Sequence, residues 1–283
     1  MPTCYRHPDR ETGLSCSECG RPICTDCVTF APVGLRCPDH AGVSAAHQAA
    51  TRAARTVQRP LARRGIVIRG AIVTRVLVGL NVLIYLITVA QGGGINDPGG
   101  KLFDKWILFG PFVAHGDYWR LLTACFLHAG VWHIAVNMYA LWWLGSVVES
   151  GIGSWRFLLL YLASGLAGSA GALLWKPDAP TVGASGAIFG ILGAGLLLEW
   201  RVTGKLMGAF AVMILINLAF TFGFSSFISV GGHVGGLVGG LAGTAIILAR
   251  RGRPQSDAVT IAGLVGVGLV SVLVAYLKVR GLA

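Results

Sequence analysis

The chain has 283 residues, of which 54% are hydrophobic and only 12% are charged, and it contains 41 glycines. Soluble domains of this size carry about a quarter charged residues, so the composition excludes an ordinary soluble protein and favours a membrane protein. The net charge of +11 is concentrated in one basic segment, and this placement favours a lipid surface over a nucleic acid.

Ligand-type residues dominate the first forty positions, which hold six of the seven cysteines. They form four pairs, each with two residues between its members: Cys4/His7, Cys16/Cys19, Cys24/Cys27 and Cys37/His40. Such pairs place thiolate and imidazole ligands on a tetrahedral ion, so eight ligands predict two structural zinc ions. The short gaps favour cross-bracing, in which the first pair joins the third and the second joins the fourth.

A disulfide framework is the alternative for these cysteines. It requires an oxidising compartment and gives the regularly placed histidines no role, whereas the charge pattern puts this region in the cytoplasm. A segment this short buries too little apolar surface to fold alone, so metal is expected to supply much of its stability. Residues 4–40 resemble the B-box class of zinc fingers. The resemblance implies protein–protein contact, and nothing in the module suggests catalysis.

A basic linker rich in Ala and Arg follows, over residues 41–73. No acidic residue lies between Asp39 and Asp97, whereas seven arginines do: Arg52, Arg55, Arg59, Arg63, Arg64, Arg69 and Arg75. We interpret the block as a juxtamembrane anchor on anionic lipid, with RNA binding as the alternative.

The rest of the chain is a series of apolar segments near the roughly 20 residues needed to cross a bilayer. We predict seven spans, at about 74–91, 127–148, 155–175, 185–200, 206–224, 228–249 and 258–277. The fourth is short, which fits if it starts below the membrane surface. Irregular backbone at that depth is tolerated only beside protein or a water-filled cavity, so a site is expected near residues 180–186.

The connection 92–126 is long and mixes polar with aromatic residues. This mixture is typical of a loop lying in the membrane interface, and an extended surface loop is the alternative.

The charges of the short loops predict the orientation of the chain in the membrane. With the N-terminus inside, inner segments carry thirteen Lys and Arg against six outside, which predicts a cytoplasmic N-terminus and an outer C-terminus.

Polar residues inside membrane spans are costly and therefore informative. Four stand out: His133, Asn137, Ser185 and His233. Each alone has a plainer interpretation as a packing residue, a helix–helix hydrogen bond or a buried core histidine. In the predicted topology, however, Ser185 and His233 lie at similar depth in the fourth and sixth spans. Glycines four apart on both helices allow the close approach that a Ser–His hydrogen bond requires.

These residue types support nucleophilic catalysis. A neutral histidine can take the proton of a serine hydroxyl, and the attack creates an oxyanion that needs donors. His133 and Asn137 are four residues apart, so they can aim two donors at one point, and the Ser185 N–H can add a third. The acid Glu199 lies fourteen residues after Ser185, about 21 Å along a helix, so a Ser–His dyad is predicted.

The motifs that carry a family resemblance occur in order over residues 75 to about 250: Trp119-Arg120, His128-x4-His133-x3-Asn137, Gly183-Ala184-Ser185-Gly186 and His233-x2-Gly236-x3-Gly240. Together they resemble the rhomboid proteases. The resemblance implies Ser185 as nucleophile and His233 as base, with His133, Asn137 and the Ser185 amide as the oxyanion hole. It also implies structural roles for His128, Arg120 and Glu149.

Two positions depart from the pattern. Gly232 stands where many relatives have Ala, and Phe189 stands where relatives often have Tyr. A Phe ring can still stack on His233, but a hydroxyl hydrogen bond is lost there. Cys125 stands alone in the membrane region, and we interpret it as an inert buried thiol.

We therefore expect an all-α membrane protein, a rhomboid-like bundle of six transmembrane helices plus a seventh C-terminal helix, with a small N-terminal cross-braced zinc module. The expected divisions are 1–40 (B-box-like module), 41–73 (linker), 74–250 (protease core) and 251–283 (seventh helix and C-terminus). The expected activity is intramembrane serine proteolysis of transmembrane protein substrates in a bacterial cell membrane, with no cofactor needed for catalysis and no nucleic acid bound. An inactive rhomboid-like adaptor or chaperone and a small-solute transporter are the alternatives.

Overall fold

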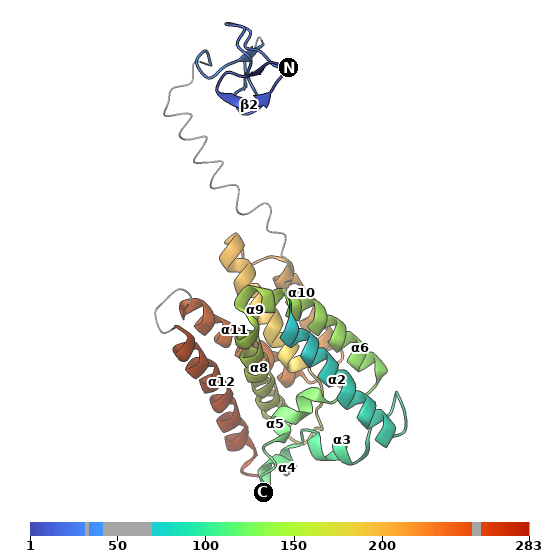
Figure 1. Cartoon of the computed structure of the whole chain (residues 1–283). Coiled ribbons are helices and arrows are strands. Elements are labelled where there is room, and N and C mark those ends of the chain that lie inside the picture. Colours follow the sequence, from blue (N-terminus) through green and yellow to red (C-terminus); the bar gives the residue numbers. More distant parts are fainter. Residues whose placement is uncertain (32–33, 42–69, 251–255, 283) are drawn as a thin grey trace. The chain divides into compact units, whose positions relative to one another are not determined.

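The computed structural model describes residues 1–31, 34–41, 70–250 and 256–282. The chain divides into two compact units, Met1–Gly65 and Ile66–Ala283 (Figure 1). Most of the predicted basic linker, 41–73, lies outside the described residues.

The N-terminal unit is built from two short antiparallel pairs of strands. β1 (Thr3–Cys4) pairs with β2 (His7–Glu11), and β3 (Thr29–Phe30) pairs with β4 (Leu35–Arg36). Its buried cluster consists of five ligand cysteines and Ile23, with four partly buried side chains packed around them. So little apolar burial is insufficient to hold a fold of this size, which fits a module organised by metal.

The membrane unit contains helices at all seven predicted positions. Six in the described part of the chain are long and apolar enough to cross a bilayer: α2 (Ile72–Gln91), the continuous helix Val131–Ile152, α8 (Ser154–Trp175), α9 (Ser185–Thr203), α11 (Val230–Arg250) and α12 (Ser256–Val279). The second comprises α6 (Val131–Ala140), a wider π-type turn (Leu141–Gly145) and α7 (Ser146–Ile152). The prediction of a mostly helical membrane protein with a small N-terminal Cys/His module is confirmed.

The fifth predicted span is shorter than expected. α10 (Ala209–Gly223) has 15 residues, whereas the sequence pattern gave 206–224. The cause is the turn before it: α9 ends at the left-handed Gly204, and Gly208 is extended, so the residues between them are not available to the helix. The helix therefore spans about 22 Å, less than the roughly 30 Å of a hydrocarbon core.

Glycines set the distance between α11 and its neighbours. A methyl group added at Gly236 would lie 1.9 Å from the carbonyl oxygen of Gly186, and one at Gly240 would lie 2.2 Å from that of Gly190. The backbones of α9 and α11 are thus in direct contact beside Ser185. The predicted close approach of these two helices is confirmed.

The connection between the first two spans is folded rather than extended. It forms α3 (Gly100–Trp106), α4 (Gly110–Ala114), α5 (Arg120–Thr123) and a 3₁₀ turn, Ala124–Phe126. The buried Arg120 ties these pieces together: it donates to the carbonyl oxygens of Asp104 (2.7 Å) and Ile107 (3.0 Å) and to the Asp117 carboxylate (2.8 Å). A guanidinium with several partners is a strong anchor for a loop.

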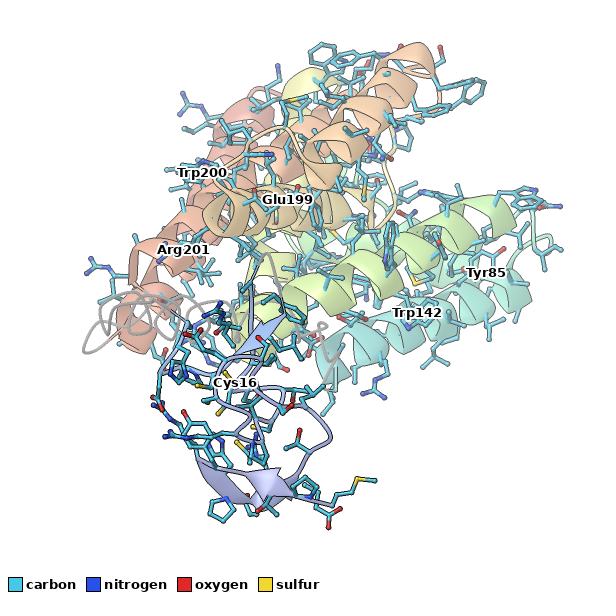
Figure 2. The ribbon with its side chains drawn as sticks, turned by 90° about the horizontal axis from the view of Figure 1, so that it is seen from above. Cys16, Tyr85, Trp142, Glu199, Trp200 and Arg201 are labelled. Atoms are coloured by element: carbon cyan, nitrogen blue, oxygen red, sulfur yellow. The ribbon has the colours of Figure 1, made fainter. Side chains whose placement is uncertain are left out.

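Two carboxylates cap the starts of distant helices. Glu149 accepts hydrogen bonds from the N–H groups of Val73 and Thr74 at the start of α2, and from the hydroxyls of Thr74 and Ser154. Glu199, at the end of α9, accepts from the N–H groups of Ala209 and Phe210 at the start of α10. Figure 2 shows Glu199 beside Trp200 and Arg201. Glu199 thus has a capping role, consistent with its exclusion from a catalytic triad.

The Glu149 cap should be measurable in stability. Glu149→Ala leaves the first N–H groups of α2 without their acceptor, and hydrogen bonds to charged groups contribute about 1.5–3 kcal/mol each. We expect a loss of at least about 3 kcal/mol in the free energy of unfolding, read by thermal unfolding of the purified protein in detergent. The exposed Asp178→Ala is the control. Equal stability of the two variants would contradict the capping role.

Candidate active site and metal-binding module

The two residues of the predicted dyad lie on touching helices. Ser185 is the first residue of α9, and His233 is buried in the first turn of α11. The imidazole of His233 stacks on the ring of Phe189, with centroids 4.1 Å apart and planes 20° apart. Because Phe189 lies one turn after Ser185, this contact holds the His233 ring against the first turn of α9. The expectation that Phe189 can replace the usual Tyr as a stacking partner agrees with this geometry.

Gly183, two residues before Ser185, packs against His133 of the second span. Its φ of +124° is a conformation that favours glycine, and a methyl group added there would lie 2.7 Å from His133 Nε2 and 3.7 Å from Ser185 Oγ. The backbone just before the predicted nucleophile therefore packs directly on the His133 ring. A side chain at this position would displace one of the two.

The protonation of His133 follows from its backbone contact. The N–H of Ala129 donates to His133 Nδ1 at 3.3 Å, so Nδ1 is the acceptor and, in the neutral ring, Nε2 carries the proton. Nε2 is the atom beside Gly183. Asn137, one turn later, is buried and uses one amide N–H to donate to the His133 carbonyl oxygen at 2.9 Å, which leaves its second N–H for another acceptor.

His133 and His233 each have one further side-chain neighbour. His128 is fully buried and lies edge-on to His133, with ring centroids 5.1 Å apart. Thr221 of α10 is buried, and its Oγ1 lies 2.7 Å from His233 Nδ1. Sequence reasoning did not single out Thr221. The signal available was a hydroxyl within an apolar span, twelve residues before His233.

The eight predicted metal ligands gather into two groups. Cys4, His7, Cys24 and Cys27 form one, and Cys16, Cys19, Cys37 and His40 form the other, with all ligand atoms of a group within 4.8 Å of one another. These are the pairings of first with third and second with fourth that cross-bracing predicts. That grouping is confirmed.

The distances fit a tetrahedral ion. Ligands at zinc–sulfur distances of about 2.3 Å would lie about 3.8 Å apart along the edges of the tetrahedron. Cys19 Sγ and Cys37 Sγ lie 3.8 Å apart, and His7 Nδ1 lies 3.5 Å from Cys24 Sγ and 3.3 Å from Cys27 Sγ. A disulfide bond would instead bring two sulfurs to about 2.05 Å.

Thiolate formation is assisted at one cysteine of each group. Burial opposes ionisation of Cys4, but backbone N–H donors at Cys24 and Arg6 outweigh it and lower the pKa of Cys4 to about 6. Burial likewise opposes ionisation of Cys16, and the N–H groups of Cys37 and Cys19 lower its pKa to about 6. A thiolate is the form that binds metal.

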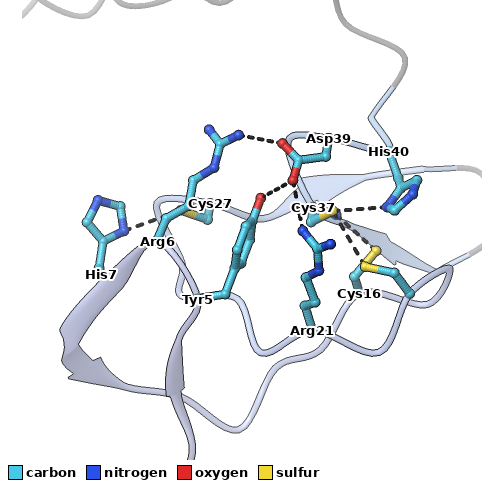
Figure 3. A network of polar contacts seen from close by, with 10 residues as sticks. Tyr5, Arg6, His7, Cys16, Arg21, Cys27, Cys37, Asp39 and His40 are labelled. Carbon is cyan, nitrogen blue, oxygen red and sulfur yellow. Dashed lines mark hydrogen bonds and ion pairs between the residues drawn. The ribbon is translucent and has the colours of Figure 1, made fainter.

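A polar network braces the module beyond its ligands (Figure 3). Asp39, between Cys37 and His40, accepts from the Tyr5 hydroxyl at 2.9 Å and pairs with Arg6 and Arg21. The Tyr5 hydrogen bond, together with these cations, lowers the pKa of the Asp39 carboxyl, while burial and the same hydrogen bond raise the pKa of Tyr5 to about 12. The network links the chain beside one ligand group to the residues beside the other.

Comparison with known proteins identifies the membrane unit. Residues 115–250 match the model of the rhomboid domain. The chain contains a rhomboid domain. It is 38% identical to rhomboid protease GluP of Bacillus subtilis over 212 residues, which cover 72% of this chain and 39% of GluP.

Two other rhomboid relatives show the range of the family. Putative rhomboid protease YdcA of Bacillus subtilis is 38% identical over 109 residues, covering 38% of this chain and 55% of YdcA. Inactive RHOMBOID-like protein 8 of Arabidopsis thaliana is 32% identical over 124 residues, covering 41% of this chain and 35% of that protein. The chain thus spans less than two thirds of the length of each of these relatives.

Proposed function

We propose that the rhomboid domain is an intramembrane serine endopeptidase in which Ser185 is the nucleophile and His233 the general base. The observation that carries the proposal is the stacking of His233 on Phe189, one turn after Ser185, between helices in backbone contact. Ser185 Oγ attacks the carbonyl carbon of the scissile peptide bond as its proton passes to His233 Nε2. The leaving amine takes that proton, and a water molecule then hydrolyses the acyl-enzyme with His233 again as base.

His133, Asn137 and the Ser185 N–H are the proposed oxyanion donors. The Ala129 contact supports this role for His133, because it leaves the proton on Nε2, beside Gly183. A neutral donor fixed in place before the reaction stabilises the developing charge without reorganisation. Among the described residues, only the His133 carbonyl oxygen accepts from the Asn137 amide, so its second N–H is available to the oxyanion.

Removing either donor should slow the reaction without unfolding the protein. We expect His133→Ala and Asn137→Ala each to lower kcat by about 10- to 1,000-fold, as loss of one oxyanion donor does in other hydrolases. The measurement is cleavage of a single-span substrate, paired with thermal unfolding of each variant. If both variants remained folded and fully active, the oxyanion would have to be stabilised by other groups.

An inactive adaptor is the second candidate, since the family contains a relative named as inactive. It predicts loss of the nucleophile or the base, and this chain retains Ser185 and His233. The deciding experiment incubates the purified protein in proteoliposomes with candidate single-span membrane proteins. Cleavage by the wild type and none by Ser185→Ala supports the protease. Intact substrates in both samples, with binding retained, would support the adaptor.

For the N-terminal unit we propose two structural zinc ions and a role in contacting a protein partner. The closed ligand groups support a structural role, because four protein ligands leave no open position for chemistry.

We also propose that the chain is divided into residues 1–40, 41–73, 74–250 and 251–283. We place it in a bacterial cell membrane, with the N-terminus in the cytoplasm and the C-terminus outside. The excess of Lys and Arg in the inner segments supports this orientation.

A further inference from the structure

Thr221 makes two short contacts through one hydroxyl group. Its Oγ1 lies 2.7 Å from His233 Nδ1 and 2.7 Å from the carbonyl oxygen of Asn217, one turn earlier in α10. The side chain is 1% exposed, so water does not compete for either contact. The buried hydroxyl therefore links α10 directly to the proposed base on α11.

The hydroxyl has one proton, and this fixes the roles in both contacts. A carbonyl oxygen can only accept, so the Thr221 O–H donates to Asn217. Thr221 Oγ1 must then accept from His233, which places the ring proton on Nδ1. The reverse arrangement, with Thr221 donating to Nδ1, would leave two oxygens 2.7 Å apart with no proton between them. Only the Nδ1–H tautomer satisfies both contacts.

We propose that Thr221 is a positioning residue that holds His233 in the tautomer needed for general-base catalysis, an inference that rests on the proposed protease function. With the proton on Nδ1, the lone pair of Nε2 is free to take the Ser185 proton. A third group that orients the base is usually a carboxylate, and here a neutral hydroxyl does so without burying a charge in the membrane. The contact also makes the orientation of His233 depend on α10 being in place.

The test compares two substitutions at this position with a matched control. Thr221→Val keeps the shape and removes the hydroxyl, Thr221→Ser keeps the hydroxyl, and Thr244→Val removes a buried hydroxyl of α11 that has no hydrogen-bond partner among the described residues. Two readouts are used on purified protein: kcat and KM for a single-span substrate, and the rate at which a fluorophosphonate labels Ser185. The second reports nucleophile reactivity without substrate docking.

We expect Thr221→Val to lower kcat and the labelling rate by about 3- to 10-fold, the range that corresponds to loss of one neutral hydrogen bond. KM should be unchanged, Thr221→Ser should restore both rates to within about twofold of wild type, and Thr244→Val should match wild type. A folded Thr221→Val protein with wild-type kcat, or a loss that Thr221→Ser does not restore, would overturn the inference.

A second measurement covers the case in which Thr221→Val does not fold. In ¹⁵N-histidine-labelled wild-type protein, the His233 signals, assigned by their absence in His233→Ala, should show the proton on Nδ1. A proton on Nε2 would refute the role of Thr221 whatever the variants do. If wild-type protein is neither labelled at Ser185 nor able to cleave, the proposed function itself fails, which is a different outcome from a normal wild type with an unaffected Thr221→Val.

Discussion

Ser185→Ala and His233→Ala are each expected to abolish cleavage, with losses in kcat of about 10⁴-fold or more. The double variant should be scarcely worse than either single variant, because a nucleophile and its base act as one unit and removing either disables both. The measurement is the release of substrate fragments, identified by mass spectrometry, from proteoliposomes that contain equal amounts of each folded variant.

Cys125→Ala is the matched control for this experiment. Cys125 is the one cysteine outside the N-terminal module and is buried, so a thiol mechanism would have to use it. We expect Cys125→Ala to retain cleavage. Activity that survives Ser185→Ala but disappears with Cys125→Ala would reject the serine mechanism. If the kcat loss of the double variant were instead the product of the losses of the two single variants, Ser185 and His233 would act separately.

Local sequence patterns were sufficient for much of the fold. The spans follow from hydropathy, and the two ligand groups follow from a regular spacing with short gaps, which restricts how four pairs can combine. The close approach of α9 and α11 follows from glycines at four-residue intervals, since Gly186 and Gly190 meet Gly236 and Gly240. In each case the signal lies within one segment or in the spacing of one residue type.

Contacts between distant segments were not predictable in the same way. Thr221 is a single hydroxyl among apolar residues, and only the packing of α10 against α11 shows that it meets His233. The distance between Glu199 and Ser185 along the helix follows from the sequence, whereas the capping of α10 by Glu199 depends on a turn whose geometry is set by Gly204 and Gly208. The folding of 92–126 into short helices depends on the partners of Arg120, which the sequence does not specify.

Removing the metal is expected to unfold the N-terminal module and to leave the membrane unit folded. Metal analysis of the intact protein should find two zinc ions per chain, and a chelator should unfold residues 1–40, because metal binding supplies about 10–16 kcal/mol in structural zinc sites. Lowering the pH should have the same effect, since protonated thiols do not bind zinc. Limited proteolysis should then cut within the module, while thermal unfolding of the membrane unit is unchanged.

Two variants distinguish the loss of a zinc ligand from the loss of a neighbouring side chain. Cys16→Ser removes a ligand and should reduce the zinc content to about one ion per chain at a site that needs four protein ligands. Ser17→Ala, at the adjacent exposed position, should leave both ions bound. Two ions in Cys16→Ser would contradict the assignment of that ligand group, and a disulfide-linked module that resists chelation would reject the zinc interpretation altogether.

The N-terminal module and the proposed proteolytic activity of the membrane unit should also be separable. In the orientation proposed from the charge pattern, the zinc ligands and Ser185 lie on opposite sides of the bilayer, so a chain that begins near residue 60 should cleave substrate at the wild-type rate. The module would then act through a partner, as its resemblance to B-box zinc fingers implies. If the shortened chain were folded but inactive, and the zinc-loaded module added separately restored cleavage, the module would belong to the working state of the enzyme.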